Sequence, residues 1–307
     1  QTGEISQALN SGKHTTTATR WYWVDPELYP ARDISIRSAS GAGYDIVHDE
    51  TGALLGTMDG QSAFRMVHQG AIYLHGGQTY LVEKLDLDER VARVRPADAE
   101  YYTQPLVMSE VRRGTEGAQT AQAGALHLEL GPVTVRSQVV GYQKIRQVTE
   151  QQMGSEALEL PAEDFETMGL WLLPSPEAMC LPEDEVYDQA GALHALEHVM
   201  IMLLPLFASC DPHDVGGIST PLHPDTSGPA ICVYDGYPGG VGIAEAAFRV
   251  VPELLRAAEH TIANCPCEQG CPACVQQASC GSMNRPLDKA GALKLVRWWL
   301  TERQSEG

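Results

Sequence analysis

Five of the eight cysteines of this chain crowd into one short segment near its C-terminal end. They are Cys265, Cys267, Cys271, Cys274 and Cys280. Zinc takes four soft or borderline ligands at the corners of a tetrahedron, and the two-residue gap between Cys271 and Cys274 lets both thiolates reach one ion from a tight turn. Gly270 permits the chain reversal that such a turn needs. We therefore predict a zinc ion bound by Cys265, Cys267, Cys271 and Cys274.

Four thiolates around zinc leave no coordination position for water, so the predicted site is structural rather than catalytic. Zinc binding then makes about 10 kcal/mol available to keep the surrounding segment folded. The alternatives are a reduced cysteine cluster without metal and a redox pair, although a redox Cys-x-x-Cys should follow a strand and open a helix. The spacing also leaves Cys280 open as a substitute for Cys265.

A second group of side chains has the spacing of metal ligands: His194, Glu197 and His198. The pattern His-x-x-Glu-His is that of inverted zinc proteases, in which two histidines on one helical face hold zinc and the glutamate activates water. A hydrolase also needs a third ligand in a wet cleft, whereas the apolar residues around this helix predict burial. We expect a buried polar network with Asp211 or Asp214 as a partner, and keep a zinc-dependent hydrolase as the alternative function.

Two glycine-containing segments share only part of the pattern of a phosphate-binding loop. Residues 236–242 stand between an expected strand and an expected helix but lack the Lys-Ser/Thr of a P-loop, so we expect a tight turn that packs the helix against the strand. No glycine stands five residues before Gly12, and no Ser or Thr follows Lys13. We therefore expect no ATP hydrolysis by this chain alone, and we predict no catalytic or cofactor-binding residue.

The net charge of −19 resists close approach to a phosphate backbone unless the basic residues gather on one face. The first 160 residues carry 14 basic and 20 acidic side chains, and the remainder carries 7 and 20. A contact with single-stranded DNA is therefore expected only in the N-terminal half, although scattered charge is ordinarily a solvated surface. The basic residues in question are Arg90, Arg93, Arg95, Arg112, Arg113, Arg136, Lys144 and Arg146.

The same half contains the aromatic run Trp21, Tyr22 and Trp23. Such side chains can stack on unpaired bases, each stack contributing about 1–3 kcal/mol. Packing in a core or between domains is the more ordinary use of buried aromatic residues, and it is the one we expect here.

Cysteine usage indicates a reducing compartment. The isolated thiols Cys180, Cys210 and Cys232 beside one close cluster do not form a disulfide framework. No apolar run approaches the ~18 residues needed to cross a bilayer, and no signal-peptide pattern opens the chain. We expect a cytoplasmic protein without a membrane partner. Because the chain begins at Gln1, we also expect it to be a piece of a longer polypeptide.

Hydropathy patterns predict strands first and helices later. Short alternating segments with glycine and aspartate turns predict strands at 34–37, 71–74, 79–82, 91–94, 127–130, 133–142, 169–173 and 230–234. Helices are expected at 186–204, 243–263 and 288–303, the last with Asp288 as its N-cap. We predict an α+β protein with a β-rich, barrel-like linker or accessory domain over residues 1–155 and a mostly helical zinc-binding domain over residues 156–307.

Several strings in combination resemble one known family. Residues 265–292 (CPCEQGCPACVQQASCGSMNRPLDKAGA), with YDGYPGGVGIAE at 234–245 and LHALEH at 193–198, are similar to the zinc-binding (MZB) domain of mitomycin repair factor A (MrfA/YprA)-type DEAD/DEAH-box helicases. Residues 29–38, 70–94 and 101–105 resemble the region that joins the motor of that family to its zinc domain. From about Trp21 onward, the resemblance covers nearly the whole chain.

The resemblance implies a C-terminal accessory region of an ATP-binding DNA translocase that moves 3′ to 5′ in DNA repair. Its partners would be the helicase motor lobes of the same polypeptide, and its structural zinc carries over to Cys265, Cys267, Cys271 and Cys274. The acidic second half favours a grip on protein over a grip on DNA. A stand-alone protein-interaction scaffold is a further alternative.

Overall fold

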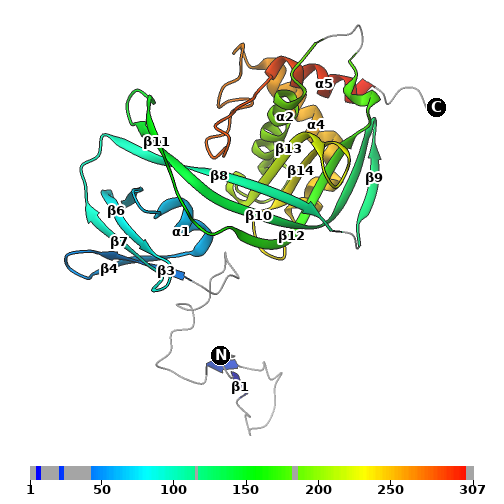
Figure 1. The fold of residues 1–307 in the computed structure, drawn as a ribbon. Coiled ribbons are helices and arrows are strands. Elements are labelled where there is room, and N and C mark those ends of the chain that lie inside the picture. Colours follow the sequence, from blue (N-terminus) through cyan, green and yellow to red (C-terminus); the bar gives the residue numbers. More distant parts are fainter. Residues whose placement is uncertain (1–4, 8–20, 24–42, 115–116, 182–185, 302–307) are drawn as a thin grey trace, which may run out of the picture. The chain divides into compact units, whose positions relative to one another are not determined.

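The computed structural model of the protein describes residues 5–7, 21–23, 43–114, 117–181 and 186–301 (Figure 1). The chain divides into two units between Ala39 and Ser40. In the first unit, β1 (Ile5–Gln7) pairs antiparallel with β2 (Trp21–Trp23). The predicted strand at 34–37, the segment around Gly12 and the predicted packing of the Trp21–Trp23 side chains lie outside what the structure describes.

A five-stranded sheet with one short helix opens the second unit. The order of its strands is β4-β3-β7-β6-β5, and every pair is antiparallel except β3 with β7. Because β4 and β5 are edges that do not pair with each other, the expected barrel is an open half-barrel. Its elements are β3 (Gly43–His48), β4 (Leu54–Asp59), α1 (Gly60–Met66), β5 (Ile72–His75), β6 (Gln78–Asp86) and β7 (Val91–Pro96).

A larger antiparallel sheet forms the centre of the second unit. Its path is β11-β10-β12-β14-β13, and β8 and β9 also pair with β10. The long strands β8 and β10 run from the small sheet to the helices (Figure 1). The strands are β8 (Tyr101–Arg113), β9 (Gln119–Ala123), β10 (Leu126–Arg146), β11 (Gln152–Ala157), β12 (Glu163–Pro174), β13 (Val215–His223) and β14 (Gly228–Asp235).

Helices cover one face of this sheet. The helices are α2 (Gln189–Leu203), α3 (Ile243–Arg249), α4 (Val251–Asn264) and α5 (Lys289–Thr301), with short 3₁₀ turns η2 (Glu177–Met179), η4 (Leu204–Leu206) and η5 (Pro212–Asp214). None of the helices described has the length and apolar character to cross a membrane.

Alternation along the central strands separates two apolar clusters. On β12, Leu170 and Leu172 pack with the helices, whereas Trp171 packs in the cluster on the opposite face. Because successive side chains of a strand point to opposite faces, a strand buried on both sides reads as a continuous apolar run. The predicted strand at 230–234, which lies within β14, is of this kind and is confirmed.

The predicted α+β class is confirmed, and two predicted boundaries are wrong. Residues 127–130 and 133–142 belong to one strand, β10, because the Pro132 carbonyl accepts a hydrogen bond from Gly114 N–H and pairing continues through the proline. The predicted helix at 243–263 is two helices that meet at Val250, where Pro252 occupies the first turn of the second. The predicted division into two domains at residue 155 stays a prediction. Strands from both sides of that residue share the large sheet.

The glycine-containing turn between β14 and α3 is held by a buried carboxylate. The two oxygens of Asp235 accept hydrogen bonds from the backbone N–H groups of residues 241–244, at N···O distances of 2.5–3.2 Å. Gly242 precedes the helix with φ +93°, a conformation that favours glycine. The anion that these N–H groups bind is therefore the protein's own, and the expected tight turn is confirmed.

We expect Asp235→Asn to lower the free energy of unfolding by about 2–4 kcal/mol, because an amide offers one acceptor oxygen and turns its own N–H groups toward backbone donors. Denaturant unfolding measures this change. Asp88→Asn, at an exposed position, is the control and should lie within about 0.5 kcal/mol of the wild type. Equal stabilities of the two variants would contradict the assigned role of Asp235.

Candidate metal centre

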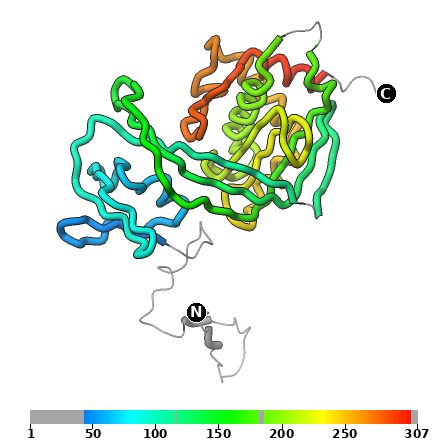
Figure 2. Tube along the Cα trace, in the orientation of Figure 1, coloured from blue at the N-terminus to red at the C-terminus, as the bar shows by residue number. Residues whose placement is uncertain are grey.

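The segment that follows α4 folds into a tight knuckle. Cys265 leaves the helix in an extended conformation, and the Cys271 carbonyl accepts hydrogen bonds from the N–H groups of residues 274, 275 and 276. Gly270 has φ +105°, and a Cβ there would lie 2.6 Å from a methyl group of Val275. The reversal that was expected at Gly270 is therefore present, and no larger residue fits it. Figure 2 shows this segment in orange beside α2.

The knuckle brings four sulfur atoms together. The Sγ–Sγ distances are 3.5 Å for Cys265–Cys267, 3.4 Å for both Cys265–Cys271 and Cys267–Cys274, and 3.8 Å for Cys271–Cys274. A tetrahedral zinc site with Zn–S bonds of about 2.3 Å has edges of about 3.8 Å, whereas a disulfide would bring two sulfurs to about 2.05 Å. The four cysteines thus have the separations of a closed tetrahedral metal site and not those of disulfides.

Lys289, the first residue of α5, supports the knuckle from outside. Its ammonium donates to the carbonyl oxygens of Cys265 and Cys267, at 2.7 and 2.5 Å, and lies 3.3 Å from Cys267 Sγ. Burial raises the pKa of the Cys267 thiol, but hydrogen bonds from Cys274, Cys265 and Lys289 bring that pKa down to about 6. Because four thiolates with one Zn²⁺ carry a net charge of −2, a lysine in this position offsets part of that charge.

The fifth cysteine lies elsewhere. Cys280 groups with His194 and His198, while Cys265 groups with the other three cysteines of the knuckle. Cys280 Sγ is 3.5 Å from His194 Nε2. Burial raises the pKa of this thiol, but hydrogen bonds with His194, His198 and Ser282 have a larger, opposite effect and bring the pKa down to about 4.

The partners predicted for the His194–His198 segment are wrong. Asp211 caps the turn η5, and Asp214 accepts a hydrogen bond from the Tyr237 hydroxyl. The two histidines bond to backbone carbonyls instead, because α2 packs beside the cysteine-rich segment.

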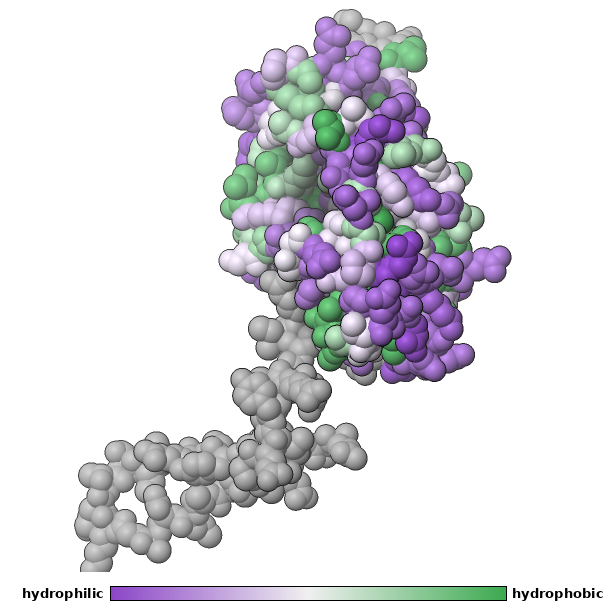
Figure 3. Space-filling model, turned by 90° about the vertical axis from the view of Figure 1, so that its left-hand side faces the viewer, coloured by the Kyte–Doolittle hydropathy of each residue, from purple (hydrophilic) through white to green (hydrophobic). Residues whose placement is uncertain are grey.

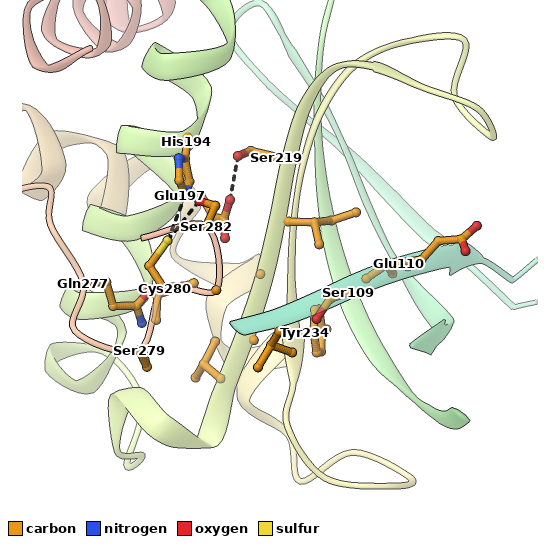
Figure 4. A pocket seen from close by; sticks show the side chains of 18 of the residues that line it. Ser109, Glu110, His194, Glu197, Ser219, Tyr234, Gln277, Ser279, Cys280 and Ser282 are labelled. Atoms are coloured by element: carbon orange, nitrogen blue, oxygen red, sulfur yellow. Dashed lines mark hydrogen bonds between the residues drawn. The ribbon is translucent and has the colours of Figure 1, made fainter. Parts of the chain in front are cut away.

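Glu197 is buried and accepts a hydrogen bond from the Ser219 hydroxyl at 2.6 Å (Figure 4). Burial raises the pKa of its carboxyl. Glu197 and His198 are thus buried and hydrogen-bonded, as expected, and His194 is half-buried. All three also line a pocket of about 720 Å³.

Most of the basic residues singled out in the N-terminal half pair with carboxylates. On the face shown in Figure 3, hydrophilic side chains lie among small hydrophobic patches. The Arg113–Glu129 pair is the most buried, with Glu129 only 3% exposed. The ion pairs are Arg93–Glu89, Arg95–Glu83, Arg112–Glu110, Arg113–Glu129, Arg136–Asp164 and Lys144–Glu156.

Comparison with known proteins identifies relatives of both the knuckle and the sheets. Residues 196–275 match the family model of the MrfA Zn-binding domain. The chain is 36% identical over 264 residues to the "Uncharacterized ATP-dependent helicase YprA" of Bacillus subtilis (strain 168), an alignment that covers 83% of this chain and 34% of that protein. It is 35% identical over 109 residues to "Uncharacterized protein MJ1572.1" of Methanocaldococcus jannaschii, covering 34% of this chain and 96% of that protein.

A solved structure also matches. The crystal structure of the DUF1998 helicase MrfA bound to DNA superposes with a TM-score of 0.56 at 32% identity, over 93% of this chain and 37% of that chain. The match falls on the C-terminal portion of MrfA. This chain spans about a third of the length of the helicases that it matches.

Two features of the site were not predicted. Lys289 has no local signal, because its contacts lie 22 and 24 residues away along the chain. The pairing of Cys280 with histidines of α2 had one signal, namely that a fifth cysteine is left over when four ligate one zinc ion.

We expect Lys289→Met, which keeps the length of the side chain and removes its charge, to weaken zinc binding about 10–100-fold while the chain stays folded. Competition with a chromogenic chelator measures the affinity. Lys294→Met on the exposed side of the same helix is the matched control. An unchanged affinity in Lys289→Met would show that this ammonium does not stabilise the thiolate cluster.

Proposed function

This chain belongs to the MrfA/YprA-type helicases through its zinc-binding region, and we propose that it acts as their C-terminal accessory region. A zinc ion on Cys265, Cys267, Cys271 and Cys274 holds the helical part folded against the sheet. The observation that carries this proposal is the tetrahedral spacing of the four sulfurs within a segment that matches the MrfA Zn-binding domain up to residue 275.

The whole protein would be an ATP-dependent DNA translocase that moves 3′ to 5′ in DNA repair. Its nucleotide would bind to motor lobes of the same polypeptide, which are also the partners we propose for this region. The acidic second half, with 7 basic and 20 acidic residues after residue 160, supports contacts with protein rather than with DNA. The thiolate ligands need a reducing compartment, which supports a cytoplasmic location.

Contact with single-stranded DNA is assigned to one end of β8 and β10. There Arg146 pairs in register with Tyr101, and Ile145 with Tyr102, which is 40% exposed. Lys144 Nζ lies 5.7 Å from the Tyr101 ring centroid. The half-buried Tyr101 ring is therefore the one beside the basic side chains of Lys144 and Arg146. An aromatic ring beside basic side chains is what a surface for unpaired bases requires. A relative, the DUF1998 helicase MrfA, was crystallised with DNA, which supports DNA binding by the whole protein.

A stand-alone interaction scaffold is the second candidate, because 34% of this chain already matches the Methanocaldococcus relative along 96% of its own length. Extending the natural reading frame upstream separates the two. Nucleotide-binding motifs in that frame support the helicase region, and their absence from the complete frame supports the scaffold. The hydrolase alternative needs metal at His194 and His198 and also water activation by Glu197, so a hydrolytic activity that is lost in Glu197→Gln would support it.

Binding of labelled single-stranded DNA tests the proposed DNA surface. We expect affinity to fall steeply between about 50 and 200 mM salt, as phosphate contacts require. Arg146→Gln should weaken binding equally for all sequences and lower the salt slope by about 1, whereas Arg249→Gln, exposed in the acidic half, should change neither. Binding that is absent at low salt, or insensitive to salt, would refute the assignment.

Removing one ligand of the four-cysteine site tests the structural role of zinc. We expect Cys271→Ser to lose zinc and to unfold or aggregate, because about 10 kcal/mol of binding free energy no longer supports the knuckle. Elemental analysis and circular dichroism measure both effects, with Cys210→Ser as the control. A soluble, folded and zinc-free Cys271→Ser protein is the result that this proposal does not allow.

A further inference from the structure

Cys280 faces His194 of α2 at the wall of the pocket (Figure 4), and His198 of the same helix also lines this pocket. Its sulfur, one ring nitrogen of His194 and one of His198 all lie within 4.8 Å of one another. The histidines are one helical turn apart, and their ring centroids are 4.2 Å apart. Three side chains of metal-ligating type therefore converge on one point outside the four-cysteine knuckle.

Backbone carbonyls determine which nitrogen each histidine presents to this point. His194 Nδ1 donates to the Pro286 carbonyl at 2.7 Å, and His198 Nδ1 donates to the Val275 carbonyl at 2.9 Å. A carbonyl oxygen can only accept, so each Nδ1 carries a proton. In the neutral ring, which is the form that binds metal, Nε2 is then the unprotonated nitrogen. Histidines that bind metal are oriented by their second nitrogen in the same manner.

Cys280 Sγ is also held in place by hydrogen-bonding neighbours. The Asn284 N–H donates to Cys280 Sγ at 3.2 Å, and the Ser282 hydroxyl lies 3.2 Å from it. When both rings are neutral, two imidazole lone pairs and this sulfur point at one another, and a single thiol proton can join the sulfur to only one imidazole at a time. A metal ion between the three satisfies all of them together.

We propose that His194 Nε2, His198 Nε2 and Cys280 Sγ bind a second metal ion. Two imidazoles and one thiolate are ligands that suit Zn²⁺. Three protein ligands leave a fourth coordination position for water or a small ligand, and the adjoining pocket of about 720 Å³ supplies the room for it. This second site is open, whereas the four-cysteine site is closed.

Glu197 is consistent with a cation at this place. Its side chain lines the same pocket, is 7% exposed, and accepts a hydrogen bond from Ser219. A divalent ion with one thiolate ligand has a net charge of +1, which compensates a buried carboxylate beside it. Glu197 does not belong to the ligand group itself. It stands on the pocket side, where the fourth ligand would lie.

Zinc content of the full chain tests the second site directly. The protein is reconstituted with excess Zn²⁺, freed of loosely bound ions by gel filtration, and analysed for zinc per chain. We expect two ions for the wild type, one for Cys280→Ser and one for His194→Gln. Cys180→Ser, which removes an exposed thiol outside both groups, should keep two ions. In the cobalt-substituted protein, the second ion should add a weaker sulfur-to-cobalt absorption than the first, because it has one thiolate ligand instead of four.

One zinc ion per wild-type chain overturns the proposal, and so does the retention of two ions by both ligand variants. Either result would leave Cys280 and His194 as a metal-free thiol–imidazole pair. Circular dichroism monitors folding of each variant. If Cys280→Ser unfolds, His194→Gln decides by the same count, since this side chain is only half-buried.

Discussion

Four cysteine sulfurs at separations of 3.4–3.8 Å are the contact on which the C-terminal part of this chain depends. Thiolates of like charge remain this close only around a cation, and the free energy of binding one zinc ion, about 10 kcal/mol, is comparable with the whole stability of a domain. Three helices meet at this point. α4 ends just before Cys265, and α5 begins with Lys289, whose ammonium donates to the Cys265 carbonyl. His198 of α2 donates to the Val275 carbonyl, next to Cys274.

The helices transmit this constraint to the sheet and to the pocket. Cys274 and Val275 are fully buried in the same apolar cluster as Leu170 and Leu172 of β12, so the knuckle is continuous with the main core. Trp299 of α5 donates to the Ala178 carbonyl, which fixes the far end of that helix. In the proposed site, the zinc ion would therefore position α2 and the loop that carries Cys280. These two elements form one wall of the pocket.

The elements with strong apolar periodicity were predictable from sequence, because burial on one or both faces leaves a pattern over five or more residues. The boundaries inside β10 and between α3 and α4 were not, since a proline can stand within a paired strand or open a new helix, and its effect depends on neighbours far along the chain. The four cysteines were predictable because zinc ligation needs short spacings. Contacts such as Lys289 with Cys267, or Cys280 with His194, arise from packing of distant segments and leave no local trace.

Hydrogen exchange of the backbone amides, with and without a strong zinc chelator, tests the central claim most directly. Removal of the thiolate-bound ion should abolish protection in the knuckle, in α5 and in the part of α2 beside Val275, while the β3–β7 sheet, which has its own apolar core, keeps its protection. Protection of α2 and α5 that stays unchanged after the metal has been removed would contradict the claim that the four thiolates and their ion hold this part of the protein together.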